Sequence, residues 1–197
     1  MLAALASLLL MTQAAPAAGA DARLEAFKAA CLPDHRAPEK RPAVFAREGW
    51  RSTLDADHPM LAEVLRLSRS EIAEDAAEGI DGDLGAWRKD LSGHPVYLVL
   101  TTVRSDIMSL TGCYLFDFAA PAIAPEPITV WLKEAPAQNV DTVGLTAQIW
   151  NVEGIEGVWD LQNSFVKAGS QAANVVGYHG MSIQMTSTVE KAAPAAN

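Results

Sequence analysis

The chain of 197 residues contains only two cysteines, Cys31 and Cys113, and has no C-x-x-C pair. Zinc ribbons, thioredoxin-like redox sites and c-type haem attachment all need closely spaced cysteines, so the sequence excludes these classes. Basic residues are also scarce, with 15 Lys and Arg against 24 Asp and Glu, which gives a formal net charge of −9. We expect no nucleic-acid partner, because clustered basic residues supply most of the affinity for phosphates.

Long hydrophobic runs are missing too. The apolar stretch from Leu2 to Met11 is roughly half of the ~20 residues that a membrane-spanning helix needs. Small residues follow it and end in Ala18-Gly19-Ala20, a pattern typical of a signal-peptide cleavage site, although no basic residue precedes the apolar stretch. We therefore predict that residues 1–20 are a signal peptide, that the mature chain is exported to the periplasm or beyond the cell, and that it does not insert into the membrane after cleavage.

Two cysteines in an exported chain most simply form a disulfide with each other. Closing a loop of this length lowers the conformational entropy of the denatured chain, which raises its free energy by about 4.5 kcal/mol in the simple chain-entropy treatment. Two alternatives stay open, a pair of free reactive thiols and a metal site in which Cys31 and His35 share a helix face. Pro33 interrupts that helix, and zinc needs three or four ligands. We predict a Cys31–Cys113 disulfide, no metal ligands and no cofactor.

The overall composition is that of a globular domain, with 50% hydrophobic and 20% charged residues. A chain of this size can bury about 70% of its unfolded surface in one core. We find no internal repeat and no composition shift that would mark a second domain. We predict a single domain over residues 21–190, followed by a flexible tail at 191–197.

Helical periodicity dominates the first third of the mature chain. Apolar residues spaced by three and four predict a short helix over residues 21–31, and a second helix opens at Pro42 and stops at Gly49. A third and longer helix begins after Asp57, which we expect to be its N-cap, and runs toward Gly79. Its apolar stripe comprises Leu61, Val64, Leu65, Ser68 and Ile72.

The period changes to two at His94. Residues 94–103, HPVYLVLTTV, are apolar on both faces, which is typical of a central strand covered on both sides. Alternation continues through residues 107–118, where Cys113 shares a face with Ile107 and Leu115. Apolar and aromatic residues occupy the other face: Met108, Leu110, Tyr114, Phe116 and Phe118. A disulfide from Cys113 would therefore attach the first helix to the sheet.

Proline residues in AAPAIAPEP separate these strands from a further helix that starts at Pro127. Strand-like segments follow at 144–150, 158–168 and 180–190, and the last of them alternates regularly between one buried and one solvated face. This order predicts an α+β fold in which N-terminal helices pack on a mainly antiparallel sheet, with one helix between the strand groups.

Catalytic signatures are mostly absent. Ser164 and Lys167 match S-x-x-K, but they follow a strand-like segment and no K-T-G is present. Asp81 and Asp83 have the first spacing of a calcium loop, yet Gly85 stands where the fifth position needs an oxygen ligand. G-x-S-x-G, G-x-G-x-x-G and phosphate-loop motifs are missing. We assign no catalytic, metal or cofactor-binding residue.

Two residues are candidates for ligand contact. Trp150 shares its strand face with Thr146 and Gln148, and a half-exposed ring there would suit binding. His179 opens the final strand beside Gly180 and could lie at a mouth of the sheet. In both cases a structural role is the competing interpretation, as a core tryptophan and a turn histidine.

The layout of the chain resembles that of short exported bacterial proteins of uncharacterised function. The resemblance lies in the order of elements: a signal peptide, a first helix that ends in Cys31, a helix that closes with Gly49-Trp50, and a central strand that bears Cys113. It implies no activity, cofactor or site residue.

The sequence leaves the function open between two main hypotheses and a third. The first is an exported, non-catalytic binding or interaction module stabilised by one disulfide, with an unknown protein or small molecule as its partner. The second is a small envelope hydrolase assembled only in three dimensions, for which His179, Ser164 and Asp160 are the residues to test. The third is a redox-responsive protein that uses the two cysteines.

Overall fold

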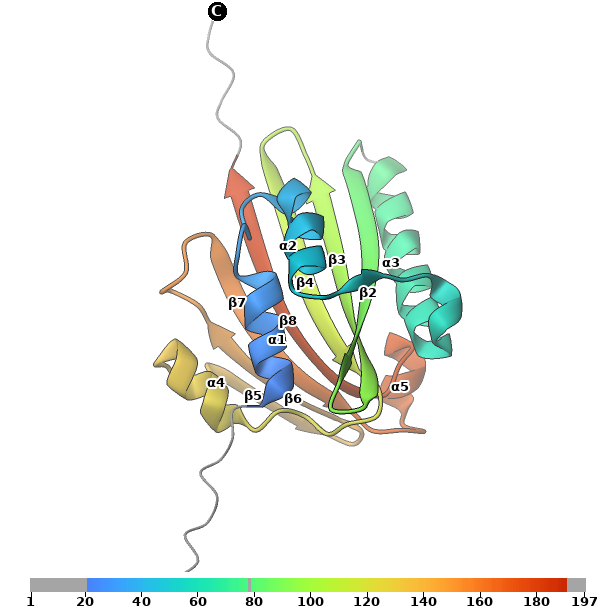
Figure 1. The fold of residues 1–197 in the computed structure, drawn as a ribbon, viewed down its shortest axis with the longest axis vertical. Helices are drawn as coiled ribbons and strands as arrows, with labels where there is room; N and C mark the ends of the chain where they lie inside the picture. The colour runs from blue at the N-terminus through green and yellow to red at the C-terminus, as the bar shows by residue number, and fades with distance from the viewer. Residues whose placement is uncertain (1–20, 78, 191–197) are drawn as a thin grey trace, which may run out of the picture.

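An antiparallel sheet organises the protein, and the computed structural model describes it over residues 21–77 and 79–190 (Figure 1). The predicted signal peptide and the predicted tail lie outside the described residues. Within them the sheet has eight strands in the order β1-β2-β3-β4-β8-β7-β6-β5. Their bounds are β1 (Arg51–Ser52), β2 (Asp81–Leu91), β3 (His94–Arg104), β4 (Met108–Asp117), β5 (Gln138–Thr142), β6 (Leu145–Asn151), β7 (Val158–Val166) and β8 (Gly180–Glu190).

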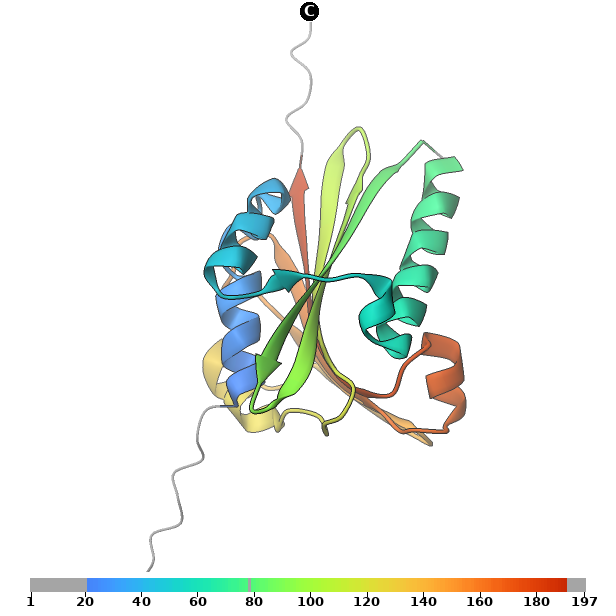
Figure 2. The same ribbon diagram turned by 45° about the vertical axis from the view of Figure 1, so that its right-hand side comes forward.

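Helices cover both faces of this sheet, as Figure 2 shows. The helices are α1 (Ala22–Cys31), α2 (Arg41–Arg47), α3 (Pro59–Ala77), α4 (Pro125–Leu132) and α5 (Gln171–Val176), with short 3-10 turns η1 (Pro38–Lys40) and η2 (Asp55–Asp57). Helices α1, α2 and α4 lie on one side, which we call the disulfide face, and α3 and α5 lie on the other, which we call the cleft face. The predicted α+β architecture is confirmed, including the helix between the strand groups.

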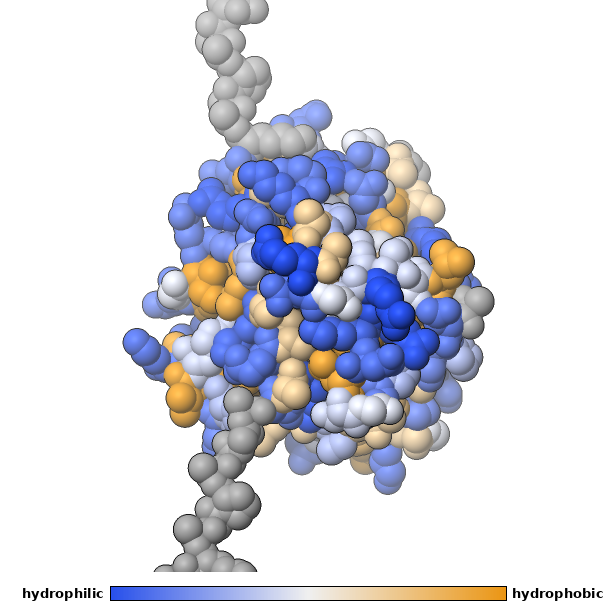
Figure 3. Space-filling view, viewed as in Figure 1, coloured by the Kyte–Doolittle hydropathy of each residue, from blue (hydrophilic) through white to orange (hydrophobic). Residues whose placement is uncertain are grey.

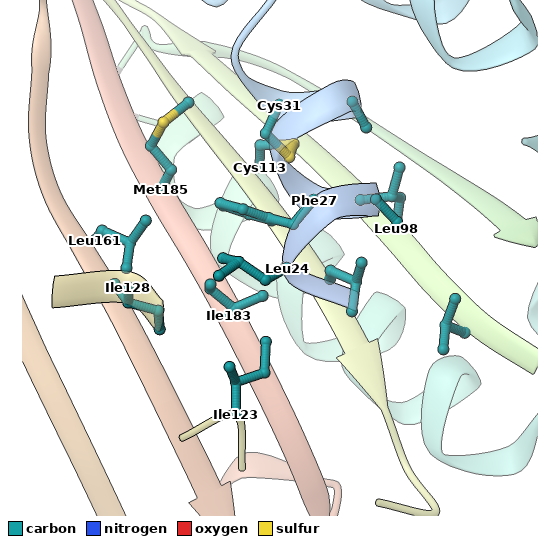
Figure 4. Packing of buried hydrophobic residues seen from close by; sticks show 14 of the residues in the cluster. Leu24, Phe27, Cys31, Leu98, Cys113, Ile123, Ile128, Leu161, Ile183 and Met185 are labelled. Carbon is teal, nitrogen blue, oxygen red and sulfur yellow. A yellow bond between two sulfur atoms is a disulfide. The ribbon is translucent and has the colours of Figure 1, made fainter. Parts of the chain in front are cut away.

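The larger core lies on the disulfide face (Figure 4). Helix α1 presents Leu24, Phe27 and Cys31 to the sheet because these residues recur every three or four positions. They meet side chains from the central strands, including Leu98, Cys113, Leu115, Ile183 and Met185. All of these are nearly or fully removed from solvent, so this face carries most of the apolar burial.

The predicted disulfide between Cys31 and Cys113 is confirmed. Both residues are fully buried, and their Cα atoms are 5.9 Å apart, which is within the range usual for disulfides. The bond joins the last residue of α1 to the middle of β4, a central strand. It therefore fixes the helix that fills the disulfide face at its C-terminal end.

A buried arginine completes the end of α1. Arg41 is fully buried at the start of α2, and its guanidinium donates a hydrogen bond to the carbonyl oxygen of Cys31. Burial lowers the pKa of Arg41 to about 10, and the nearby carboxylate of Asp34 opposes this shift. The guanidinium therefore stays charged at neutral pH, where a cation favours the C-terminal carbonyls of a helix.

The outer surface on this side is polar. Figure 3 shows it with apolar residues in small separate groups among hydrophilic ones. Among the described helices, none is long and apolar enough to cross a membrane.

The structure corrects several details of the helices and turns. Asp57 is not the N-cap of the third helix; it belongs to η2 and accepts a hydrogen bond from Thr53, and His58 precedes α3 in its place. Ile107 lies in the exposed turn before β4 rather than on the face of Cys113. Helix α5, between β7 and β8, was not predicted.

Strands also differ from the expectation. The sequence did not reveal β1, β2 or β5, and the alternate polar face of β8 is not simply solvated. Ser182 is buried, and Gln184 and Thr186 are half-buried, because this part of the cleft face lies under or beside helices. That half-covered polar face becomes the floor of the candidate site.

The disulfide leads to a stability prediction. We expect the double variant Cys31→Ala, Cys113→Ala to lose on the order of 4 kcal/mol of unfolding free energy, because it removes an 82-residue loop constraint from the denatured chain. Urea unfolding followed by tryptophan fluorescence measures the difference, and wild type treated with dithiothreitol serves as a second comparison. Equal midpoints for the variant and the oxidised wild type would show that the bond contributes little.

Candidate functional site

A cleft of about 420 Å³ lies between α3, α5 and the cleft face of the sheet. We call it the α3–α5 cleft. Its apolar lining comes from both helices and from β3 and β4: Val64, Leu67, Val99, Phe116, Val175 and Val176. Its polar lining consists of Ser68, Glu71, Tyr114, Tyr178 and Gln184.

The position of α3 creates the cleft. Leu61, Val64 and Leu65 pack with Tyr97 and Val99 and so hold α3 over the β2–β3 side of the sheet. Ile72 can approach the sheet because the residue of β2 beneath it is Gly82. A Cβ on Gly82 would lie only 2.6 Å from the Ile72 Cγ2. Strands β4 and β8, which follow β3 in the sheet, are left only partly covered.

Helix α5 closes one end of this opening. It ends at Gly177, which has a φ of 79° in the left-handed region that glycine adopts without strain. A Cβ on Gly177 would lie 2.6 Å from Glu63 and 3.0 Å from Leu67, so α5 and α3 touch through this glycine. The two helices thereby form a continuous wall around the cleft.

Tyr114 lies at the centre of the floor. Its ring leans along β4 over Gly112, where a Cβ would lie 2.5 Å from the phenol oxygen. Burial raises the pKa of Tyr114, while a hydrogen bond with Thr101 acts in the opposite direction. The phenol is therefore protonated at neutral pH and can both donate and accept a hydrogen bond.

Tyr178 has the same character at the α5 end. Burial raises the pKa of its phenol, and the hydroxyl shares a hydrogen bond of 2.9 Å with the Ser182 hydroxyl. Its ring meets Phe116 edge-on, with centroids 5.1 Å apart. The aromatic floor is held by packing on one side and by a hydroxyl pair on the other.

A row of neutral polar side chains leads away from the cleft across β8 and β7. Gln184 donates to Gln162 at 3.3 Å, and Gln162 donates to Ser164 at 2.7 Å. Because amides and hydroxyls both donate and accept, the row can satisfy varied polar groups without changing charge. The arrangement can bind and orient a ligand.

The two predicted contact residues do not lie in this cleft. Trp150 is fully buried in the core of the disulfide face, so it lacks the half-exposed ring on which the binding interpretation depended. His179 lies outside the cleft near the start of α3, where its backbone N–H points to the Met60 sulfur at 3.3 Å. It lines a smaller cavity of about 250 Å³ together with His58 and Phe118.

The structure does not bring together the three residues of the hydrolase hypothesis. Asp160 and Ser164 lie on one strand, four residues and about 13 Å apart. His179 precedes β8 and contacts the start of α3 rather than either of them. Ser164 is buried and its hydroxyl accepts a hydrogen bond from Gln162, which leaves it without a base.

A histidine and carboxylate pair that the sequence analysis missed joins β3 to β4. His94 Nε2 lies 2.9 Å from the Oδ2 of Asp117, which is fully buried. Asp117 also accepts a hydrogen bond from the Ala119 backbone and lies 3.7 Å from the Arg23 guanidinium of α1. These contacts join β3, α1 and the loop after β4 to the end of β4. Neither His94 nor Asp117 lines the α3–α5 cleft, so the pair has a structural role. The sequence could have predicted this pair, because His94 begins one strand of a hairpin and Asp117 ends the other, which places both residues at the same end of the hairpin.

Metal binding finds no support in the part of the chain that the structure describes. No three His, Cys, Asp or Glu side chains are grouped there as metal ligands. Asp81 and Asp83, which have the spacing of a calcium loop, lie in β2 and pair with Arg104.

His58 gives the wall of the cleft a pH-sensitive end. Its Nδ1 accepts a hydrogen bond of 3.2 Å from the Met60 N–H in the first turn of α3, and its ring stacks on Phe118. Burial lowers the pKa of His58, and the neighbouring His179 lowers it further. Protonation would remove the acceptor and place a positive charge at the positive end of the helix dipole.

We therefore expect stability to fall as the pH drops below the ordinary histidine pKa of about 6.5, because the unfolded chain then binds the proton more readily than the folded chain. The loss should level off below the lowered pKa of the folded state. His58→Asn keeps a capping acceptor and does not titrate, so it should lose less unfolding free energy between about pH 7.5 and about pH 5. Urea titrations at both pH values measure this difference, and equal pH dependence of the two proteins would contradict it.

Comparison with known proteins gives no relative. No protein-family model, curated protein or solved structure matches the chain, so the resemblance in layout to short exported bacterial proteins stays a prediction.

Proposed function

We propose that the protein is an exported, non-catalytic binding module that holds a small molecule in the α3–α5 cleft. The cleft itself is the observation that carries this proposal. Its volume of about 420 Å³ lies within the range of small-molecule sites, and it combines apolar walls with a few polar groups. An apolar part of the ligand would lie against Val64, Leu67 and Val99, and a polar part would meet Tyr114 and Gln184.

The chemistry of the lining supports binding rather than catalysis. Among the described residues that line the cleft there is no histidine, cysteine or lysine. Tyr114 and Tyr178 have raised pKa values because of burial, so neither is a ready base at neutral pH. Ser68 lies on α3 without a histidine in the lining to activate it.

The buried disulfide supports export. Such bonds persist in oxidising compartments and are rare in the cytosol. Cys31 and Cys113 are both fully buried and joined, which suits a structural bond better than a redox switch.

Filling the cleft should abolish binding. Ser68→Trp places an indole in the space between α3 and β4, so we expect it to weaken the binding of the neutral dye Nile red by at least roughly tenfold. Wild type should bind about one equivalent with a rise in dye fluorescence. Ser70→Trp is the matched control, because Ser70 is exposed on the same helix and does not line the cleft.

Circular dichroism and a urea midpoint for each variant check that the fold is kept. Wild type that binds no dye, or a Ser68→Trp variant that binds it as tightly as Ser70→Trp does, would contradict the proposal.

A further inference from the structure

We infer that the ligand of the α3–α5 cleft is an organic cation that carries an apolar group. This inference rests on the proposed function, because it specifies the chemistry of the molecule held at the same site. Two carboxylates without a cationic partner and an aromatic floor carry it.

Glu71 supplies the first carboxylate. It projects from α3 and is the one charged side chain among the described residues that line the cleft. Two other acidic groups on or beside α3 are paired, Glu63 with Arg66 and Asp55 with Arg69. Glu71 has no ion pair within the described part of the chain, so its charge is available to a ligand.

Asp160 supplies the second carboxylate from the opposite side. The strand register places Gly112 opposite Thr186, and Thr186 opposite Asp160, so Asp160 lies two strands, or about 10 Å, from the glycine beneath the Tyr114 phenol. The Oδ1 of Asp160 is buried and has no hydrogen-bond partner among the described residues. A buried carboxylate oxygen is costly to leave unpaired, and a positive charge nearby would lower that cost.

Tyr114 responds to both carboxylates. After burial, which is the main cause, the negative charges of Glu71 and Asp160 further raise the pKa of its phenol. The two acids therefore act on the same point of the floor from α3 and from β7. A positive group at that point would lie beside Glu71 and the neutral hydroxyl, and the charge of Asp160 would attract it from two strands away.

The aromatic floor suits the same charge. Tyr114 and Phe116 lie nearly parallel with centroids 6.2 Å apart, and Tyr178 meets Phe116 edge-on. Faces of aromatic rings attract organic cations, and quaternary ammonium groups are commonly bound in this way. The formal net charge of −9 also favours the approach of a cation over that of an anion.

An anionic ligand fits poorly. Within the described lining there is no Lys, Arg or His to neutralise a carboxylate or phosphate. Glu71 would repel such a group directly. The apolar walls formed by Val64, Leu67 and Val99 remain available to the hydrocarbon part of any ligand.

Three probes with one hydrocarbon chain test the inference: octyltrimethylammonium, octyl glucoside and octanoate, each below its micelle concentration. Isothermal titration calorimetry on the mature disulfide-bonded protein should give an affinity for the cation at least roughly tenfold higher than for octanoate, and the preference should shrink as salt is added. Glu71→Gln and Asp160→Asn should each reduce the preference. Glu71→Gln replaces an exposed side chain and so tests the charge without risk to the core.

Glu74→Gln is the matched control, since it removes the same charge from an exposed position of α3 outside the cleft. A preference that survives Glu71→Gln, or equal binding of octanoate and the cation, would overturn the cationic assignment while leaving the cleft as a binding site. If none of the three probes binds and Nile red also fails to bind, the proposed function itself is wrong.

Discussion

The attachment of α1 to the middle of the sheet is the constraint on which the rest of the structure depends. Phe27 and Leu24 fill the disulfide face, and the Cys31–Cys113 bond fixes the end of the same helix on a central strand. Arg41 then holds the end of α1 by donating a hydrogen bond to the Cys31 carbonyl oxygen. Helix packing, a covalent bond and a charge-assisted hydrogen bond therefore coincide within about two turns of helix.

Because these contacts stabilise the disulfide face, the cleft face can be covered less completely. On the cleft face, α3 covers β2 and β3, and α5 has only six residues, so β4 and β8 are partly open between them. An open sheet face in a small domain normally costs apolar burial. Here the open area carries Tyr114, Gln184 and Gln162, which keep hydrogen-bond partners in the folded chain, so the cost is limited.

The sequence predicted the disulfide face well because its signals are local. Spacings of three and four placed Leu24, Phe27 and Cys31 on one side of a helix, and alternation placed Cys113 on the inner side of its strand. A disulfide between the two cysteines of the chain then joins those two faces. The one long-range step of the prediction rested on the presence of just two cysteines, which are 82 residues apart.

Strand β2 was missed because tertiary contacts override its composition. Gly82 and Gly85 are poor strand formers, yet Gly82 admits Ile72 from α3, and Gly85 lies under the ring of Trp87. The turn after β2 did carry a signal in the sequence, since Ser92-Gly93 is a dipeptide that marks turns, and in the structure both residues have positive φ values in a two-residue hairpin. A short hairpin can thus be predicted from the residues of its turn even where the strand before the turn cannot be predicted.

The candidate site could not be read from the sequence for a related reason. Glu71, Tyr114, Tyr178 and Gln184 come from a helix, a strand, a loop and another strand, and no spacing connects them. Individually each looks like an ordinary solvated or packed side chain. What distinguishes them is the incomplete cover that α3 and α5 give to the sheet, which depends on the Gly82 and Gly177 contacts.

Charge in the cleft follows from the same geometry. A tyrosine phenol, with its ordinary pKa of about 10, is neutral at pH 7, and burial first and then the charges of Glu71 and Asp160 raise the pKa of Tyr114 further, so the phenol adds no third negative charge. A neutral phenol between two carboxylates offers a donor to one acid and a ring face to a cation, whereas an ionised phenol would repel both acids. Burial therefore accounts for most of the raised pKa of Tyr114, and Glu71 and Asp160 add to it at a site that has no positive side chain of its own in its described lining.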